Sequence, residues 1–166
     1  MAGKQSESDE AQTVFLFSDG SVNNQTKVGY GAYLLTPSLD IEPSEYSYRV
    51  RVKRFENTSS SQLEIETFLW AISECPEVSI KAFSDSQTLI RLPERRQQLE
   101  AQDYCSKSGK PLNHGRLYRD FFQISDRLSL TLAKVKGHSP TNQQQRRERI
   151  FALVDRASRT ALRKNQ

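Results

Sequence analysis

The stretch Val14-Phe15-Leu16-Phe17-Ser18-Asp19-Gly20-Ser21 decides the fold, because an apolar, aromatic-rich run stops at a carboxylate. Four consecutive apolar residues that lead into turn formers predict a buried β-strand. Asp is depleted in strands, and a partly desolvated charge requires a cation, hydrogen bonds or a metal as its partner. Taken alone, Asp19-Gly20-Ser21 is also an ordinary start of a turn. The stretch indicates a functional carboxylate only if another strand of the chain ends in the same way.

The same arrangement recurs later in the chain. Val78-Ser79-Ile80-Lys81-Ala82-Phe83-Ser84-Asp85-Ser86-Gln87 is again a short apolar strand that ends in Ser-Asp-Ser and leads into a helical pattern. If the two strands are neighbours, Asp19 and Asp85 lie side by side at one edge of the sheet. Two carboxylates placed so repel each other unless a cation lies between them, and oxygen ligands of this kind suit Mg²⁺ or Mn²⁺.

Two more strands and a helix are predicted between these stretches. Residues 28–35 form the first of the strands, and Gly29 and Gly31 within it indicate a bulge or a close backbone approach. Residues 46–55 form the second, with one solvated face, because apolar and polar residues alternate along it. Short turns join these strands to the first one, which favours an antiparallel meander. Residues 63–72 then predict a helix that is apolar almost all round, preceded by serine N-cap candidates.

Two more carboxylates lie on predicted helices. Glu64 lies along the apolar stripe of its helix, whereas Glu66 lies on another face. The final helix, predicted over residues 143–163, carries Asp155 at the edge of its buried stripe. Each residue also has a simpler interpretation, since a Glu near a helix start is favoured by the helix dipole and Asp155 could pair with Arg159 one turn later.

The remaining segments alternate between helix, loop and strand. After Pro93 the chain is polar and helical as far as Cys105, and the basic loop over residues 106–111 follows. Residues 117–124 predict an amphipathic helix, and residues 128–135 predict another strand. A loop rich in turn formers then separates this strand from the final helix.

Length and composition set the broad class. A chain of 166 residues with 36% hydrophobic content predicts one domain, which we place over residues 13–166 behind a disordered polar leader over residues 1–12. Two cysteines without metal-ligand spacing, and no apolar run that could span a membrane, predict a reduced cytoplasmic protein without a membrane partner. A net charge of +4 with cations gathered near the end of the chain suits either a polyanionic partner or a solvated helix face. With no second domain visible, a monomer is expected.

Taken together, these features resemble the type 1 ribonuclease H family over nearly all of the chain after the leader. The sequences that resemble the family's acidic and closing motifs are Phe-Ser-Asp-Gly-Ser (17–21), Ser-Gln-Leu-Glu (61–64), Ser-Asp-Ser-Gln (84–87), Val-Lys-Gly-His (135–138) and Asp-Arg-Ala (155–157). Gly109-Lys110-Pro111-Leu112 resembles the basic protrusion with which many members grip the duplex. The resemblance implies an α/β fold of the RNase H type: a five-stranded mixed sheet, with an antiparallel meander of three strands plus two parallel strands, flanked by helices.

The resemblance also implies an activity and the residues that carry it. Asp19, Glu64, Asp85 and Asp155 would bind two Mg²⁺ or Mn²⁺ ions, and His138 would move protons or help the product to leave. The implied reaction is endonucleolytic hydrolysis of the RNA strand of an RNA/DNA hybrid, which leaves 5′-phosphate and 3′-hydroxyl ends. Contacts with 2′-hydroxyls, and not with base edges, would select the substrate, so no base-sequence specificity is expected.

Substrate-binding residues follow from the same resemblance. They lie after the first Asp motif, around the start of the Glu64 helix, in the basic loop and in the closing segment: Gly20, Ser21, Ser59, Ser60, Gln62, Lys110, Lys136 and Asn142. Serines stand before Glu64 where familiar bacterial members have Asn, and the segment between His138 and Asp155 is longer than in compact members. A non-catalytic binding module on the same fold, and a resolvase or exonuclease relative that cuts DNA, are the alternative functions.

Overall fold

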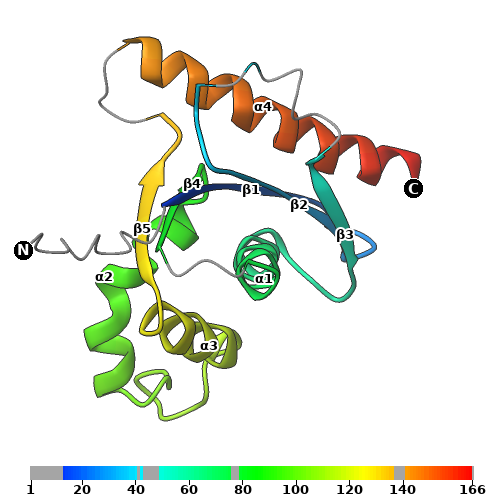
Figure 1. Ribbon diagram of the computed structural model, residues 1–166. Helices are drawn as coiled ribbons and strands as arrows, with labels where there is room; N and C mark the ends of the chain where they lie inside the picture. The colour runs from blue at the N-terminus through cyan, green and yellow to red at the C-terminus, as the bar shows by residue number, and fades with distance from the viewer. Residues whose placement is uncertain (1–12, 41, 43–48, 76–78, 137–140, 166) are drawn as a thin grey trace, which may run out of the picture.

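The structure is a computed structural model that describes residues 13–40, 42, 49–75, 79–136 and 141–165. Within these residues, one mixed sheet carries helices on both of its faces (Figure 1). The elements follow in the order β1 (Val14–Asn23), β2 (Val28–Thr36), β3 (Arg51–Phe55), α1 (Ser60–Ser73), β4 (Ser79–Ser84), α2 (Gln87–Ala101), α3 (Gly115–Ser125), β5 (Ser129–Lys134) and α4 (Thr141–Lys164). The predicted leader over residues 1–12 lies outside the described residues.

The sheet has the predicted topology. Its five strands lie in the order β3-β2-β1-β4-β5. The pairs β1–β2 and β2–β3 are antiparallel, whereas β1–β4 and β4–β5 are parallel. The prediction of an antiparallel meander of three strands plus two parallel strands is therefore confirmed.

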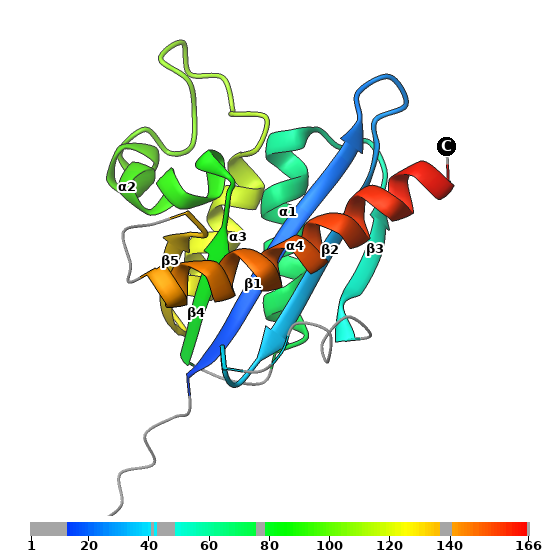
Figure 2. The same ribbon diagram turned by 90° about the horizontal axis from the view of Figure 1, so that it is seen from above.

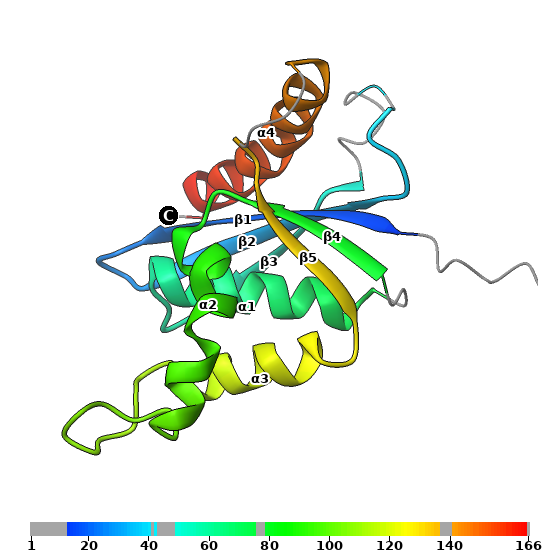
Figure 3. The ribbon, with the colours of Figure 1, turned by 90° about the vertical axis from the view of Figure 1, so that its left-hand side faces the viewer.

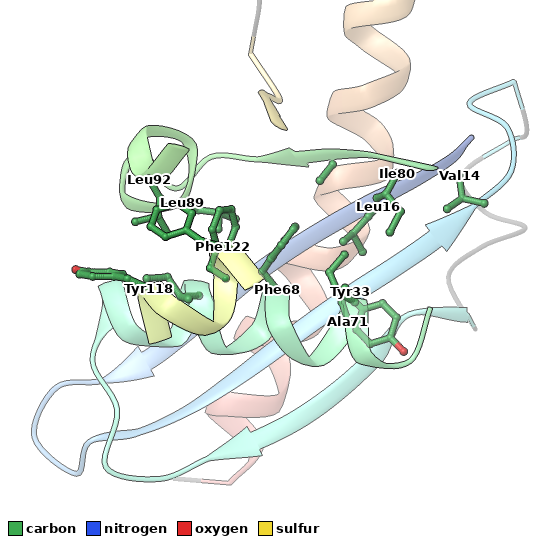
Figure 4. Close-up of a cluster of buried hydrophobic side chains, with 14 of the residues drawn as sticks. Val14, Leu16, Tyr33, Phe68, Ala71, Ile80, Leu89, Leu92, Tyr118 and Phe122 are labelled. Carbon is green, nitrogen blue, oxygen red and sulfur yellow. The ribbon is translucent and has the colours of Figure 1, made fainter. Parts of the chain in front are cut away.

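Apolar cores hold helices on both faces of the sheet. The larger core lies between the sheet and the helices α1, α2 and α3 (Figure 4), and its fully buried members include Leu16, Ile65, Phe68, Ile80, Leu89, Leu92 and Phe121. The smaller core lies under α4 and includes Phe17, Leu34, Phe83, Ile150 and Val154. Because complete burial of one such side chain contributes about 1.5–3 kcal/mol, these two cores fix both helix layers relative to the sheet.

β1 and β4 separate just before the carboxylates that follow them. Their parallel pairing runs only as far as Phe17 and Phe83. β1 then continues beside β2 through Asp19, whereas the chain leaves β4 at Asp85 and enters α2, whose N-cap is Ser86. The separation leaves room at the carboxyl end of β4, where ligand sites of open α/β sheets commonly lie. Side chains from α1 on one face and from α4 on the other can reach this opening.

Glycines on β1 and β2 let α1 lie very close to the sheet. A methyl group at Gly20 or Gly29 would come within 2.8 Å of the Leu63 side chain, and one at Gly31 would overlap Thr67 Oγ1. The close backbone approach predicted from the glycines of β2 is thus observed. It places the Glu64 turn of α1 against β1 at the position of Asp19 and Gly20.

We expect Gly31→Ala to destabilise the domain by about 1–3 kcal/mol, because the added methyl group would overpack against the buried Thr67 side chain. Adding Thr67→Ala should recover part of the loss, since it removes the atoms that the new methyl group would meet, and Thr67 Oγ1 has no hydrogen-bond partner to lose. Denaturant unfolding of the wild type, both single variants and the double variant measures the coupling free energy. Strictly additive effects would contradict the steric explanation.

The edge strand β3 differs from its prediction. It begins at Arg51, while residues 46–48 of the predicted strand lie outside the described residues. The expectation of one buried face is wrong, because all residues from Arg51 to Arg54 are exposed and only Phe55 is half-buried. β3 is the last strand of the sheet, and the helices cover mainly the inner strands. Val52 is 41% exposed for this reason.

Two further expectations concern α2 and the cysteines. α2 continues as one helix through Pro93, because an exposed proline removes only one helical hydrogen bond and the helix stays anchored by Leu89, Leu92 and Leu99. Cys75 and Cys105 are not joined in a disulfide, in agreement with the prediction of reduced thiols. Among the described helices, none is both long and apolar enough to cross a membrane.

Candidate active site

Four carboxylates from four different elements meet where β1 and β4 separate. Asp19 lies in β1 and Asp85 follows β4, while Glu64 comes from α1 and Asp155 from α4. The Asp19 side chain is hydrogen-bonded to both Asp155 and Glu64, and the charge of Asp85 raises the pKa of Glu64. Residues far apart in the sequence therefore form one acidic group at a single point of the sheet.

Burial and repulsion between neighbouring carboxylates raise the pKa values of Asp19, Glu64 and Asp85. The pKa of Asp19 rises from 3.8 to about 8, first because the side chain is desolvated, and then because of the hydrogen bond to Asp155 and the charge of Glu64. Desolvation also raises the pKa of Glu64, to about 7, against the backbone amide of Gly20, which donates a hydrogen bond to it. Asp85 is the most exposed of the four, and partial desolvation still raises its pKa. Paired shifts of this kind are typical of functional sites.

An open cavity of about 600 Å³ adjoins the acidic group. Asp19, Asp85 and Asp155 line it from one side, together with Glu148. Its cations are Lys136 and Arg159, and the charge of Lys136 lowers the pKa of Asp85. The cavity thus brings negative oxygens and positive side chains within reach of one bound molecule.

The donor atoms of this site suit a hard divalent cation. All four side chains offer carboxylate oxygens, and Glu64 Oε2 is buried without a hydrogen-bond partner. In the described part of the chain, no three acidic, His or Cys side chains already stand in a metal-ligand cluster. Arg159 Nε lies 2.9 Å from Asp155 Oδ1, so a cation would compete with this arginine for Asp155. The chemistry of the residues fits Mg²⁺ or Mn²⁺, and the ligands would have to close around it.

Comparison with known proteins gives the family. The RNase H family model matches residues 11–158, which is most of the chain. The chain belongs to the ribonuclease H family. It is therefore a nuclease, a hydrolase of phosphodiester bonds.

Two relatives illustrate the range of the similarity. The ribonuclease H of Prosthecochloris aestuarii is 25% identical over 130 residues, which cover 76% of this chain and 84% of the relative. Among solved structures, the foamy viral protease-reverse transcriptase in complex with dsDNA superposes with a TM-score of 0.59 at 11% identity, over 90% of this chain and 95% of that one. At that identity the second similarity supports the ribonuclease H fold alone.

The other residues expected from the ribonuclease H motifs lie in several parts of the fold. Gly20 and Ser21 directly follow Asp19 on β1, and Ser21 Oγ lies 3.0 Å from the buried Ser158 Oγ of α4. Lys136 lines the cavity, whereas Asn142 is exposed at the start of α4. His138 lies outside the described residues.

Ser59, Ser60 and Gln62 form the N-terminal turn of α1, one turn before Glu64. Ser59 is the N-cap, and its Oγ accepts a hydrogen bond of 3.3 Å from the Gln62 backbone amide, as its sequence position predicts. Lys110 is exposed on the loop between α2 and α3, which protrudes from the body of the ribonuclease H domain (Figure 3). The motif residues therefore fall into a group near the carboxylates and a separate position on this loop.

Glu148 is a fifth carboxylate at the cavity that the motifs do not indicate. Its charge raises the pKa of Asp85, and its Oε1 accepts a hydrogen bond of 3.1 Å from Gln144 Nε2. The same Gln144 nitrogen donates to the Val135 carbonyl at the end of β5, over 3.0 Å. The spacing could have revealed Glu148, because it lies seven residues before Asp155 and so on the same face of α4.

Proposed function

We propose that this ribonuclease H hydrolyses internal phosphodiester bonds in the RNA strand of RNA/DNA hybrids. The observation that carries the proposal is the meeting of Asp19, Glu64, Asp85 and Asp155 beside one open cavity, which the three aspartates line, in a chain whose family match spans nearly its full length. All four carboxylates of the family's motifs are present, which argues against a module that binds without cutting.

The four carboxylates are inferred to hold two divalent cations, Mg²⁺ or Mn²⁺. Such a pair, when bound, supplies the Lewis acidity that activates the attacking water and stabilises the leaving 3′ oxygen, which gives 5′-phosphate and 3′-hydroxyl products. The remaining tasks belong to the protein. Lys136 and Arg159 on the cavity wall would hold the scissile phosphate near carboxylates that otherwise repel it. His138 would assist proton transfer or product release, as its motif implies.

Recognition of the RNA strand is assigned to the first turn of α1. Ser59, Ser60 and Gln62 offer hydroxyl and amide groups that can contact 2′-hydroxyls in a minor groove. Contacts with 2′-hydroxyls distinguish RNA from DNA, but they do not read the identity of the base. Gly20 and Ser21 would contact the substrate beside Asp19, and Lys110 and Asn142 would contact backbone phosphates.

The direct test is cleavage of an RNA/DNA hybrid labelled on each strand in turn, compared with RNA/RNA and DNA/DNA duplexes of the same sequence. With Mg²⁺ or Mn²⁺ we expect internal cuts in the RNA strand of the hybrid alone, and with EDTA we expect none, because the clustered carboxylates need a cation to accept a phosphate. The ends of the products are read by their response to phosphatase and to a 3′-end ligase. If the protein cut the DNA duplex, the site would be that of a DNA nuclease. If it bound the hybrid without cutting it, the proposed reaction would be wrong.

A further inference from the structure

A row of three arginines runs along the exposed side of α4. Arg149, Arg156 and Arg163 are separated by seven residues each, so they project from nearly the same side of the helix. With a rise of 1.5 Å per residue, neighbours in this arginine row are about 10.5 Å apart along the helix axis. All three side chains are exposed. Figure 2 shows α4 lying across the sheet with its outer side toward the viewer.

Among the described residues, the arginine row has no acidic partner at helical spacing on its own helix. Within the described residues, none of its members forms an ion pair. The described residues three and four positions away are Gln145, Arg146, Ala152, Leu153, Arg159 and Thr160, and none is acidic. Two arginines outside the row, Arg146 and Arg159, are instead paired with Asp40 and Asp155. The chain thus neutralises arginines beside the row and leaves the row itself unpaired.

A merely solvated helix face explains this pattern poorly. Such faces normally place opposite charges three or four residues apart, and like charges at those spacings destabilise a helix. Arg163 lies in the last turn of α4, where a cation is favoured by the helix dipole, but this does not account for Arg149 or Arg156. The only carboxylates of α4, Glu148 and Asp155, both face the cavity. The carboxylates of α4 thus lie at the cavity and the unpaired arginines on its outer side, an arrangement that suits a polyanion in contact with the outer side of the helix.

The arginine row also borders the candidate active site. Arg156 directly follows Asp155, and Ala152 and Arg159, which lie between the row and the carboxylates around the helix, both line the cavity. A nucleic acid with one phosphate in the cavity would carry its neighbouring phosphates past this side of α4. Arginine binds phosphate oxygens in a bidentate manner and does not lose its charge.

We propose that Arg149, Arg156 and Arg163 form a phosphate-binding surface for the hybrid backbone that flanks the scissile phosphate. This inference rests on the proposed function, since it takes the hybrid in the carboxylate cavity as the bound molecule. It predicts a contact that supplies affinity and position without reading sequence.

The test is equilibrium binding of a fluorescently labelled 20-base-pair RNA/DNA hybrid in EDTA, over a series of salt concentrations. For Arg149→Gln/Arg156→Gln/Arg163→Gln, we expect the slope of log K against log salt to be shallower than for wild type by about 2–3, at about 0.7–0.9 for each lost phosphate contact. With Mg²⁺, the same variant should cut the hybrid with a raised KM and a kcat close to that of wild type.

The matched control, Arg51→Gln/Arg54→Gln/Arg127→Gln, removes three exposed arginines outside α4 and should keep the wild-type slope. The row variant should melt no lower than wild type, because Gln is a good helix former and repulsion is relieved. A row variant with the wild-type slope, or with a change equal to that of the control, overturns the inference while leaving the proposed reaction intact. A wild type that cuts no hybrid at all overturns the proposed function itself.

Discussion

Asp19→Asn is expected to reduce the rate of hybrid cleavage by about 10³-fold or more, and at the same time to make the metal-free protein more stable to heat at neutral pH. The loss of activity follows because Asp19 is the member of the acidic group in contact with both Asp155 and Glu64. Removing one carboxylate from a cation clamp costs several kcal/mol of transition-state stabilisation, and each 1.36 kcal/mol is about tenfold in rate.

The gain in stability follows from the raised pKa of Asp19. Between pH 3.8 and about 8 the folded protein keeps a proton on Asp19 that the unfolded chain releases. The unfolded state therefore binds fewer protons in this window, and the free energy of unfolding falls as the pH rises through it. Asn cannot ionise, so the variant escapes this loss, and the advantage should grow from pH 5 to pH 8.

Thermal unfolding in EDTA at several pH values measures this effect. For a domain of this size each kcal/mol corresponds to about 2–4 °C in Tm. Wild type should also gain stability from Mg²⁺ or Mn²⁺, because a ligand that binds only the folded state raises Tm, whereas Asp19→Asn should gain much less. If the melting temperatures of wild type and variant differed by the same amount at every pH, the raised pKa of Asp19 would be contradicted.

The second large effect is expected at Glu64, with Glu66 as its matched control on the same helix. Glu64→Gln should lower cleavage by about 10²–10³-fold, because its buried Oε2 has no hydrogen-bond partner and so can serve as a cation ligand. Glu66 has a different task, since its Oε1 accepts a hydrogen bond of 2.6 Å from Thr58 Oγ1 at the start of α1. Gln can accept the same bond, so Glu66→Gln should cut at a rate within a few-fold of wild type.

Initial cleavage rates and calorimetric titration with Mn²⁺ should distinguish the two variants without relying on one readout. Glu64→Gln is expected to bind Mn²⁺ more weakly than wild type, and Glu66→Gln is expected to bind it equally well. Both substitutions keep helix propensity and side-chain size, so both variants are expected to fold. If Glu66→Gln proved the more damaging change, the choice of Glu64 as the functional residue of α1 would be wrong.

Much of the fold could be predicted because its signals are local. The two Phe-Ser-Asp strand ends indicated neighbouring strands, and the register places Phe17 beside Phe83 as this repeat requires. The exposure of β3 could not be predicted from its alternating pattern, because burial at a sheet edge depends on which helices cover it. The sequence motifs indicate the four carboxylates but not Glu148, which only its spacing of seven residues from Asp155 on α4 connects with them.

The contact between Asp155 and Arg159 shows a similar limit. Sequence reasoning treated pairing with Arg159 and membership of the acidic group as alternatives for Asp155. In the structure the same side chain does both, since it is hydrogen-bonded to Asp19 and lies 2.9 Å from Arg159. A pattern along one helix cannot reveal this, because the second partner comes from β1 on the sheet beneath it.

The separation of β1 from β4 after Phe17 and Phe83 has a consequence for biosynthesis. The opening is filled by side chains from four elements, and the last of them, Asp155, belongs to α4. A chain that emerges from the ribosome in sequence order holds three of the carboxylates long before the fourth. The ability to hydrolyse a substrate should therefore arise in a single late step, when α4 docks on the sheet, and chains that still lack α4 should not cut.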